Sequence, residues 1–461
     1  MTVSTPNAEY TNNLPRWQRV ADCVEGSDCV KKAGAKYLPI PSQDDTADGS
    51  RYKAYVERAS YVNFTGHTKA GLVGMVFRKD LEAELPTTVE YVSDNANGSG
   101  LTLDQMVRDT IGETLEAGRY GLLVDYPEAP EGLTAQQVSD LGLRANIMPY
   151  KASRVINWRT TTIGGVTLLS LVVLQEDHEE VSESGFEVAV KKYHRVLKLE
   201  DGVYVQELWN DKDELEEITQ PRMFNGERWN IIPFIFVGSQ NNDPTVDKAP
   251  LLDIADLNIS HYRNSADYEE SSFMVGQPMY FFAGLSQTVI DMMNKQGFVI
   301  GSRRVGLGNE GSKPYLLQAS PNQMPLEGMR EKEGQMVKIG AKIITDSTGN
   351  ATAEAAKIRF AGSNSQLSTL VGNVESAFIQ CMEWALMFMG GEGQDVKLEI
   401  NRNFYDATLD PQMVMAQIQL LDRGIIADTD LRWSLRRGNL ISDQRTDEEI
   451  ESEAEATDIL R

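Results

Sequence analysis

Hydrophobic positions in the first third of the chain recur every three or four residues, the period of an amphipathic helix. This spacing predicts a helix over 51–77 (RYKAYVERASYVNFTGHTKAGLVGMVF), interrupted at Gly66 because glycine weakens a helix interior. A second helix is predicted over 103–117, with Gly118 ending it. The apolar run that follows, GLLVDYP, is short and ends at a proline, so it indicates a buried strand.

The period changes to two between Thr161 and Trp209. Three alternating runs, VTLLSLVVLQ, FEVAVKKYHRVLKL and GVYVQELWN, are joined by the polar segments EDHEEVSESG and EDG. Alternating runs separated by polar turns are typical of consecutive antiparallel strands, so an antiparallel meander is predicted. A further buried strand, IIPFIFVG at 231–238, completes this region.

Helical spacing returns from Pro250, which suits the first turn of a helix, to about Met274. The next segments are predicted to be a strand at 277–283, a helix at 285–296, a small glycine-rich β element at 297–320 and a helix at 321–344. The longest helical pattern covers 351–389, with a kink expected at AGSNS (361–365) because glycine and small polar residues weaken helical hydrogen bonding. A strand (KLEINRNF), two short helices and an acidic end complete a chain of the α+β class.

The charge balance of the 461 residues is acidic, with 44 Lys and Arg against 68 Asp and Glu and a formal net charge of −24. A simple nucleic-acid-binding protein needs a basic face to displace counterions from phosphates, so this class is not expected. Hydrophobic residues make up 41% and charged residues 24%, which excludes disordered and collagen-like chains. The length suggests about three domains or one large discontinuous domain.

Three cysteines, Cys23, Cys29 and Cys381, do not form a disulfide framework or a structural metal site and fit a reducing compartment. Cys23 and Cys29 could pair, but two free thiols are favoured. The N-terminus lacks the pattern of a signal peptide, and no run approaches the roughly 20 apolar residues of a membrane helix. We therefore expect a soluble protein, intracellular where it is made, without a membrane partner.

Motifs that usually carry chemistry occur in unfavourable contexts. Residues 306–311 (GLGNEG) match the G-x-G-x-x-G dinucleotide pattern, but Pro314 and the YLLQ run oppose the helix that this motif requires, so a loop tip is predicted. Residues 177–180 (DHEE) have metal-ligand composition, yet they fall in an expected hairpin turn without a second His cluster. Neither G-x-S-x-G nor a P-loop is present, and the four histidines are scattered. The sequence therefore gives no positive case for an enzyme, a cofactor or a metal.

Charge is distributed unevenly along the chain. Residues 295–342 contain eight Lys and Arg against four Glu, whereas residues 443–461 contain eight acids against two Arg. One interpretation is a solvated helix face and a disordered acidic tail. The other is a directional molecule whose ends differ in charge.

The order of helix, short Gly- and Arg-rich β insertion, helix and long interrupted helix resembles that of portal proteins, the head-to-tail connectors of tailed bacteriophages. PLLDIADLNISHYRNSADYEE looks like the helix after the first β region of one portal family. ATAEAAKIRFAGSNSQLSTLVGNVESAFIQCMEWALMFMG is similar to that family's long kinked helix, and INRNFYDATLDPQMVMAQIQLLDRGIIADTDLRWSLRRGNLI resembles its end region. The resemblance covers roughly residues 230–450, and the first 230 are compatible but less specific.

This resemblance implies a portal fold with a wing, a helical stem, a small β-containing clip, a long kinked helix and a short helical crown. The implied segments are 1–284 for the N-terminal part of the wing, 285–296 and 321–344 for the stem helices, 297–320 for the clip, 345–400 for the wing return with its tunnel loop and kinked helix, and 401–461 for the crown and acidic C-terminal tail. The clip and the crown are both short for a portal.

The resemblance also implies a non-enzymatic ring of 12 subunits at one capsid vertex, through which double-stranded DNA is packaged and later ejected. The implied partners are the terminase large subunit, then a head–tail adaptor or tail protein, with the major capsid protein and scaffold around the ring. The protein would reside in the virion, and in the host cytoplasm during assembly.

Three sets of residues acquire roles by this resemblance. The clip cations, expected to face a partner or the channel, are Arg303, Arg304 and Lys313. The basic stem residues are Lys295, Arg330, Lys332, Lys338 and Lys342. The tunnel loop and kink, expected to line the narrow part of the channel, comprise Asp346, Ser347, Thr348, Gly349, Asn350, Gly362, Ser363, Asn364 and Ser365. The alternative for the loop is an exposed connection without a channel role.

Two other functions stay open: another phage head or adaptor protein, and a nucleotide-binding enzyme built on residues 306–311. The net charge of −24 suits a conduit better than a binder. Acidic walls repel phosphates and let a duplex slide, and attraction need occur only at a few rings of Lys and Arg.

Overall fold

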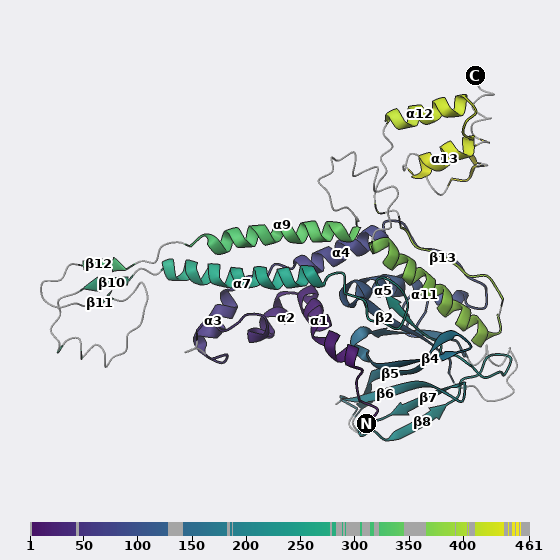
Figure 1. Cartoon of the computed structure of the whole chain (residues 1–461), viewed down its shortest axis with the longest axis horizontal. Coiled ribbons are helices and arrows are strands. Elements are labelled where there is room, and N and C mark those ends of the chain that lie inside the picture. Colours follow the sequence, from purple (N-terminus) through teal and green to yellow (C-terminus); the bar gives the residue numbers. More distant parts are fainter. Residues whose placement is uncertain are drawn as a thin grey trace. The chain divides into compact units, whose positions relative to one another are not determined.

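A computed structural model of the chain describes residues 2–42, 46–127, 142–181, 185–186, 188–276, 279–282, 288, 291, 305–306, 314–317, 322–344, 366–391, 393–402, 404, 411–437, 441, 445–447, 449–450 and 452. Contacts among its residues divide the chain into two compact units, 1–400 and 401–461. The first unit mixes helices with two antiparallel sheets, which agrees with the α+β class (Figure 1).

The first unit begins with five helices, of which the first, fourth and fifth are capped at their N-termini by side chains. They are α1 (Ala8–Glu25), α2 (Ser27–Lys32), α3 (Ser50–Arg58), α4 (Phe64–Val76) and α5 (Leu103–Ala117), with 3₁₀ turns η1 (Gly34–Lys36), η2 (Glu90–Ser93) and η3 (Ala152–Arg154). Thr102 and Gln105 form a capping box at the start of α5, and Gly118 ends the helix with φ 71°. The helix predicted over 103–117 is therefore confirmed.

The helix predicted over 51–77 is two helices, and the break falls at 59–63 rather than at Gly66. Asn63 caps α4 because its side-chain oxygen accepts a hydrogen bond of 2.7 Å from the Gly66 amide. A Cβ atom on Gly66 would lie 2.8 Å from the Val24 carbonyl oxygen at the end of α1. Gly66 is needed for close packing between helices, and it does not interrupt one.

The two largest antiparallel sheets of the first unit lie next to each other in the chain. In the smaller sheet β2 (Arg119–Asp125) lies between β3 (Asn146–Lys151) and β9 (Phe234–Gly238). The larger sheet follows chain order: β4 (Val155–Ile163), β5 (Val166–Val181), β6 (Val188–Glu200), β7 (Val203–Trp209) and β8 (Leu215–Thr219). The predicted meander and both predicted buried strands are confirmed.

The polar segment after VTLLSLVVLQ is strand rather than turn. β5 continues to Val181, and residues 177–180, expected in a hairpin turn, pair with β6. Asp177 lies opposite Lys192 and His178 opposite Lys191. Asp177–Lys192 is a cross-strand pair of opposite charge, and Lys191 forms an ion pair with Glu180 of β5, so the polarity of this segment reflects paired strands and not a loop.

The helix α11 (Gln366–Met389) supplies much of the core, packing against α5, β2 and β9. Near its end the Phe388 ring lies 4.5 Å from Trp229 and 5.4 Å from Tyr126, centroid to centroid. Short strands β1 (Glu82–Glu84) and β13 (Lys397–Glu399) pair antiparallel. The helical pattern of 366–389 is confirmed, while 351–365, with the expected kink, lies outside the described residues.

The second unit contains α12 (Pro411–Asp422) and α13 (Asp428–Arg437), which pack against each other. Both helices were predicted from the sequence. Arg436 of α13 forms an ion pair of 2.5 Å with Asp447. Among the described helices of either unit, none combines the length and apolarity needed to cross a lipid bilayer.

Candidate functional site: a helical arm with a terminal sheet

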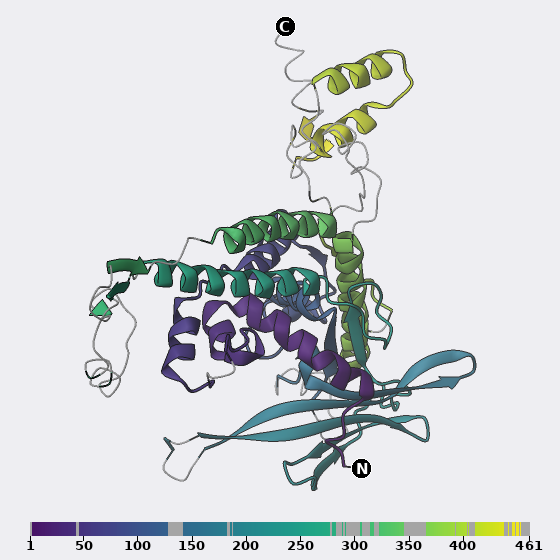
Figure 2. The same ribbon diagram turned by 60° about the vertical axis from the view of Figure 1, so that its left-hand side comes forward.

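Two long helices of the first unit lie side by side and carry a small sheet at one end (Figures 1 and 2). They are α7 (Leu252–Val275) and α9 (Met324–Ile344), about 36 and 31 Å long at 1.5 Å per residue. In the sheet, β10 (Met279–Phe282) pairs antiparallel with β12 (Pro314–Leu317) and parallel with β11 (Val305–Gly306). The two helices and this sheet are called the arm.

The arm differs from the segments expected for the stem and clip. The strand predicted at 277–283 was assigned to the wing, but β10 forms the centre of the sheet expected for the clip. The helix that packs along α9 is α7, which was also assigned to the wing. Of the expected stem helix 285–296, only Thr288 and Asp291 are described, and both are helical. Strand pairing between distant segments decides this arrangement, and sequence periodicity carries no information about it.

Two glycines of α9 face side chains of α7. A Cβ atom on Gly328 would lie 2.6 Å from Nδ2 of Asn264, and one on Gly340 would lie 4.0 Å from Ile254. These pairings run in opposite directions along the two helices, so α7 and α9 are antiparallel. Met329 and Met336 are buried on α9 and fill the space between these two contacts.

The base of the arm is locked to α4 by one buried amide. Oδ1 of Asn258 accepts hydrogen bonds from the Thr65 amide (3.2 Å), the Thr65 hydroxyl (3.0 Å) and the Tyr61 hydroxyl (3.0 Å). Its Nδ2 donates to the Val62 carbonyl oxygen at 2.8 Å. Because Asn258 and Thr65 are fully buried, these bonds replace water that cannot reach them.

The far half of α7 is braced by α3. The Tyr55 hydroxyl donates a 2.7 Å hydrogen bond to Asp267. Arg58 forms an ion pair with Glu270, and its guanidinium lies 4.3 Å from the centroid of the Phe273 ring. With contacts at both ends, α7 is held to the body over most of its length.

One polar contact joins the two helices of the arm. Nε2 of His261 in α7 lies 3.2 Å from Oε1 of Glu333 in α9. The imidazole is buried and meets the edge of the Phe64 ring, centroids 5.6 Å apart. His261 therefore links α4, α7 and α9 at one point, which a scattered single histidine in the sequence did not suggest.

The basic residues predicted for the stem are partly described. Arg330 and Lys338 are exposed on α9, and Lys332 is half-buried, where burial lowers its pKa and the charge of Glu331 opposes that shift. Lys342 lies in the last turn of α9, and its side chain is outside the description. Outside the described residues altogether are Lys295, Arg303, Arg304 and Lys313.

Acidic residues of α7 offset the charge of α9. The range 324–344 contains four cations and three acids, while 252–275 contains one cation and five acids. The described helices of the arm are thus acidic as a pair, although the sequence segment 295–342 is basic. The excess of cations in 295–342 therefore comes mainly from the residues between α7 and α9, namely Lys295, Arg303, Arg304 and Lys313.

The predicted tunnel loop and kink also lie outside the described residues. They comprise Asp346, Ser347, Thr348, Gly349, Asn350, Gly362, Ser363, Asn364 and Ser365. Their role in a channel stays a prediction. The described chain resumes at Gln366, where α11 begins.

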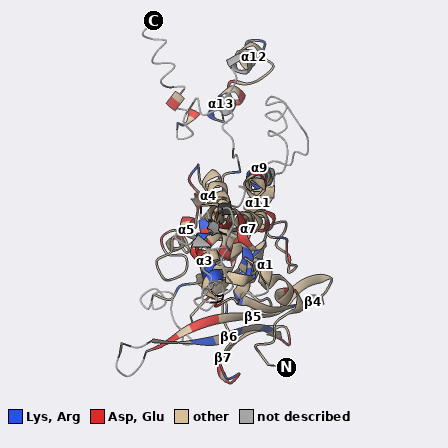
Figure 3. Ribbon diagram, turned by 90° about the vertical axis from the view of Figure 1, so that its left-hand side faces the viewer, with Lys and Arg blue, Asp and Glu red and all other residues tan. Residues whose placement is uncertain are grey.

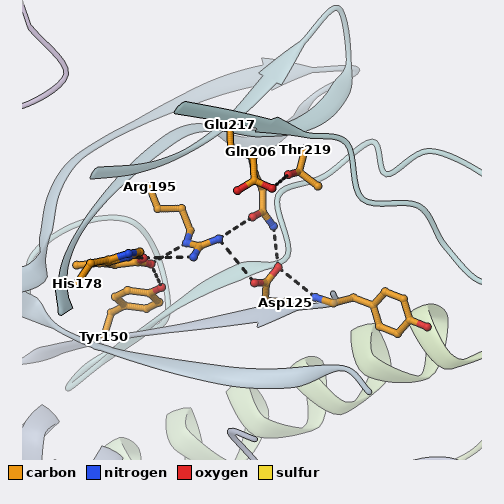
Figure 4. Close-up of polar contacts among 9 residues, drawn as sticks. Asp125, Tyr150, His178, Arg195, Gln206, Glu217 and Thr219 are labelled. Atoms are coloured by element: carbon orange, nitrogen blue, oxygen red, sulfur yellow. Dashed lines mark hydrogen bonds and ion pairs between the residues drawn. The ribbon is translucent and has the colours of Figure 1, made fainter. Parts of the chain in front are cut away.

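A partly buried polar cluster that the sequence did not reveal joins the two sheets (Figure 4). Arg195 of β6 donates from Nε (2.7 Å) and Nη2 (3.2 Å) to the carboxylate of Glu176 on β5. The Tyr150 hydroxyl of β3 donates to the same carboxylate at 2.6 Å. Gln206 of β7 accepts from Arg195 at 3.1 Å and donates to Asp125 of β2 at 2.9 Å.

The electrostatics of this cluster are those of a structural ion pair. Burial raises the pKa of Glu176, but hydrogen bonds and charge from Arg195 outweigh burial, so the pKa lies below its ordinary value. Burial and the Glu176 charge both raise the pKa of Tyr150 well above 10.0. All three groups keep their usual charge at neutral pH. The cluster therefore fixes the two sheets together, and it offers no group poised for proton transfer.

Residues that suggested enzymatic chemistry are placed in structural positions. Strand β12 begins at Pro314, three residues after the GLGNEG segment, where a dinucleotide-binding motif would require a helix. His178 stacks on the Tyr193 ring at 4.3 Å and contacts Glu176 at 3.1 Å. Within the described part of the chain, no group of three or more His, Cys, Asp or Glu side chains could hold a metal ion.

Comparisons with known proteins give one family match. The model of a family described as "Domain of unknown function (DUF4055)" matches residues 250–389, which run from the start of α7 to the end of α11. No curated protein sequence matches the chain. The match therefore groups the arm with α11 but supplies no function.

Several solved structures are similar over most of the chain. A chain from the virion of a native gene transfer agent (GTA) particle is 13% identical, with 88% of this chain and 98% of that chain covered and a TM-score of 0.39. A chain from the neck of the native GTA particle, computed with C12 symmetry, is 13% identical, with 88% of this chain and 98% of that chain covered and a TM-score of 0.37. A chain from the neck of the empty GTA particle, computed with C6 symmetry, is 14% identical, with 89% of this chain and 98% of that chain covered and a TM-score of 0.38. At these TM-scores the function has to follow from the chain's own features.

Proposed function

We propose that this chain is a portal protein, the subunit of a ring at one capsid vertex of a tailed phage or phage-like particle, through which double-stranded DNA is packaged and ejected. The observation that carries the proposal is the arm. Two packed helices hold a small sheet at the end of a mixed α+β body. The sequence resemblance to portal proteins, which covers roughly residues 230–450, includes the described elements from α7 to α11.

The construction of the arm supports docking rather than catalysis. The Asn258 hydrogen bonds and the Arg58–Glu270 pair hold α7 to the body, and the small sheet follows directly on the end of this helix in the chain. A terminal sheet suits a docking site for the terminase large subunit and then for a head–tail adaptor or tail protein. In this proposal the chain is a structural protein without a cofactor, in contact with the major capsid protein and scaffold.

The charge of the chain supports a conduit for DNA. Twelve copies with a formal charge of −24 each would surround a duplex mostly with acidic surface. Such walls repel phosphates at short range, so the duplex can slide, while exposed cations such as Arg330 and Lys338 supply local attraction. A protein that held DNA tightly would need the opposite balance.

Electron microscopy of the purified chain and of the particles that contain it tests this proposal. We expect a ring with an axial channel, a mass near twelve times 51.3 kDa and a single copy of the ring per particle. Binding to free duplex DNA should be weak at physiological salt. Particles in which the chain is spread over the whole shell, or found only in the tail, would instead identify another head or tail component.

A further inference from the structure

The tip of the β4–β5 hairpin is uncharged and exposed, whereas Val172, Val173 and Leu174 toward its base are buried and Arg159 of β4 is exposed beside the uncharged run. Residues 160–175 (TTTIGGVTLLSLVVLQ) contain no Asp, Glu, Lys or Arg, in a chain where 24% of residues are charged. At its tip Ile163 is 53% and Val166 59% exposed. Figure 3 shows the contrast with β5 beyond this segment and with β6, where acidic and basic residues gather. A long β-branched hairpin without charge is a surface that readily pairs with another chain.

The outer edge of β4 is covered over only half its length. The Asn7 amide donates to the Ile156 carbonyl oxygen at 2.8 Å, and the Asn7 side chain donates to the Trp158 carbonyl oxygen at 3.2 Å. The side chain of Asn157 donates to the Thr5 carbonyl oxygen at 3.0 Å. From Arg159 to the tip, no described segment pairs with this edge. The chain thus protects the first half of its edge strand with its own N-terminal segment and leaves the second half open.

The other edge of the same sheet is protected by charge. The edge strand β8 is LEEIT, with Glu216 and Glu217 in its centre, and Glu214 precedes it. Acidic residues of one sign on an edge prevent pairing with other chains. Of the two edges of this sheet, the β8 edge is therefore protected by acidic residues, whereas the hairpin at 160–175 is not.

A second exposed apolar patch lies at the opposite end of strand β5. It consists of Phe186, Val188 and Val190 at the β5–β6 end, which are 93%, 51% and 62% exposed. Because β5 is 16 residues long, about 50 Å at 3.3 Å per residue separates this patch from Val166. Figure 2 shows the two hairpins extending from opposite ends of the sheet.

We infer that the β4–β5 hairpin docks against the β5–β6 end of a second copy of this chain, so that copies associate head to tail. Two different apolar patches at opposite ends of one subunit fit a heterologous contact, which closes into a ring when the rotation permits. Copies with a charge of −24 repel each other, so contact is least costly where the surface carries no charge. A nucleic acid or an anionic membrane would require a cluster of cations, whereas residues 159–175 contain a single one, Arg159. This contact would join neighbouring subunits of the ring in the proposed function, and its closure into a ring rests on that proposed function.

Lysine substitutions at two matched isoleucines test the contact. Ile163→Lys places a charge at the open hairpin, and Ile218→Lys places the same charge on β8, where the side chain is 55% exposed against 53% for Ile163. Sedimentation over a wide concentration range should show at least tenfold weaker association for Ile163→Lys and no change for Ile218→Lys. Unchanged circular dichroism and melting temperature will show that both variants fold. Equal association of both variants, or a wild-type chain that stays monomeric throughout, overturns the inference.

A mixing experiment tests the direction of the contact. Val188→Lys should weaken association as Ile163→Lys does. In a head-to-tail arrangement, a mixture of the two variants retains one intact pair of patches and forms dimers without longer species. A mixture in which no dimers form overturns the pairing of these two patches. If electron microscopy shows rings that form equally well with Ile163→Lys, the portal proposal stands and this contact is rejected. If the copies associate through the hairpin but only into open filaments that never close into rings, this contact stands and the portal proposal is rejected.

Discussion

Thr65 of α4 and Asn258 of α7 are joined twice, because the amide oxygen of Asn258 accepts hydrogen bonds from both the backbone N–H and the hydroxyl of Thr65. Substitution Asn258→Ala removes this acceptor together with the donor to Val62 and leaves several buried polar groups unpaired. We expect the free energy of unfolding to fall by about 3 kcal/mol, measured by urea denaturation. Ser272→Ala at an exposed position of the same helix serves as the control and should change the free energy of unfolding by less than about 0.5 kcal/mol. Equal losses would show that the Asn258 bonds do not secure the arm.

Gly66→Ala tests the close packing of α4 against the end of α1. The new methyl group would lie 2.8 Å from the Val24 carbonyl oxygen, a backbone atom that cannot rotate away. We expect a loss of about 1–3 kcal/mol in the free energy of unfolding. At Gly71 and Gly74 of the same helix nothing lies within 4 Å of the new methyl group, so alanine there should stabilise by about 0.5–1 kcal/mol. Stabilisation by all three substitutions would contradict the packing argument.

Sequence reasoning succeeded where structure is decided locally. The capping box at Thr102 and the left-handed Gly118 lie next to the helix they bound, so the ends of α5 follow from adjacent residues. The role of Gly66 depends on Val24, and the place of β10 depends on strands 23 or more residues away, so neither can be inferred from a period. The same holds for the candidate site: the length of α7 and α9 was predictable, but not that α7 is the partner of α9.

Glu176→Gln tests the cluster between the two sheets. The folded-state pKa of Glu176 is lowered, so its contribution to stability is complete above its ordinary pKa of 4.5 and is lost as the pH falls through the folded-state value. We expect Glu176→Gln to cost about 2–3 kcal/mol at pH 7, because Arg195 loses a charged, bidentate partner. The difference from wild type should shrink as the pH falls below about 4.5.

Denaturation at a series of pH values measures this difference. The control is Glu179→Gln, because Glu179 is exposed on the same strand. It should change the free energy of unfolding by less than about 0.5 kcal/mol at any pH. A Glu176→Gln cost that stays constant down to pH 3 would show that the carboxylate charge does not stabilise the cluster.

Arg58→Ala tests the bracing of the far half of α7. The substitution removes the ion pair with Glu270 and the cation–π contact with Phe273, which together hold this half to α3. We expect amide hydrogen exchange to become about tenfold faster in residues 266–275, equivalent to about 1.4 kcal/mol of local stability. Arg19→Ala is a matched control, because Arg19 pairs with Asp256 near the start of the same helix at 2.5 Å. It should leave exchange in 266–275 unchanged, and acceleration by both variants would point to a global effect.

Reversing the exposed charges of α9 separates folding from the proposed function. Arg330 and Lys338 form no ion pair with any other described residue, so the double variant Arg330→Glu, Lys338→Glu should keep the wild-type melting temperature to within about 2 °C. In a portal, the same variant would turn local attraction for DNA or for an acidic partner into repulsion, so particles should form but contain less DNA. The control Arg228→Glu, Lys212→Glu changes the net charge equally at exposed sites outside the arm and α3 and should package normally. Packaging that falls equally in both variants would mean that total charge, and not the position of these cations on the arm, determines the passage of DNA.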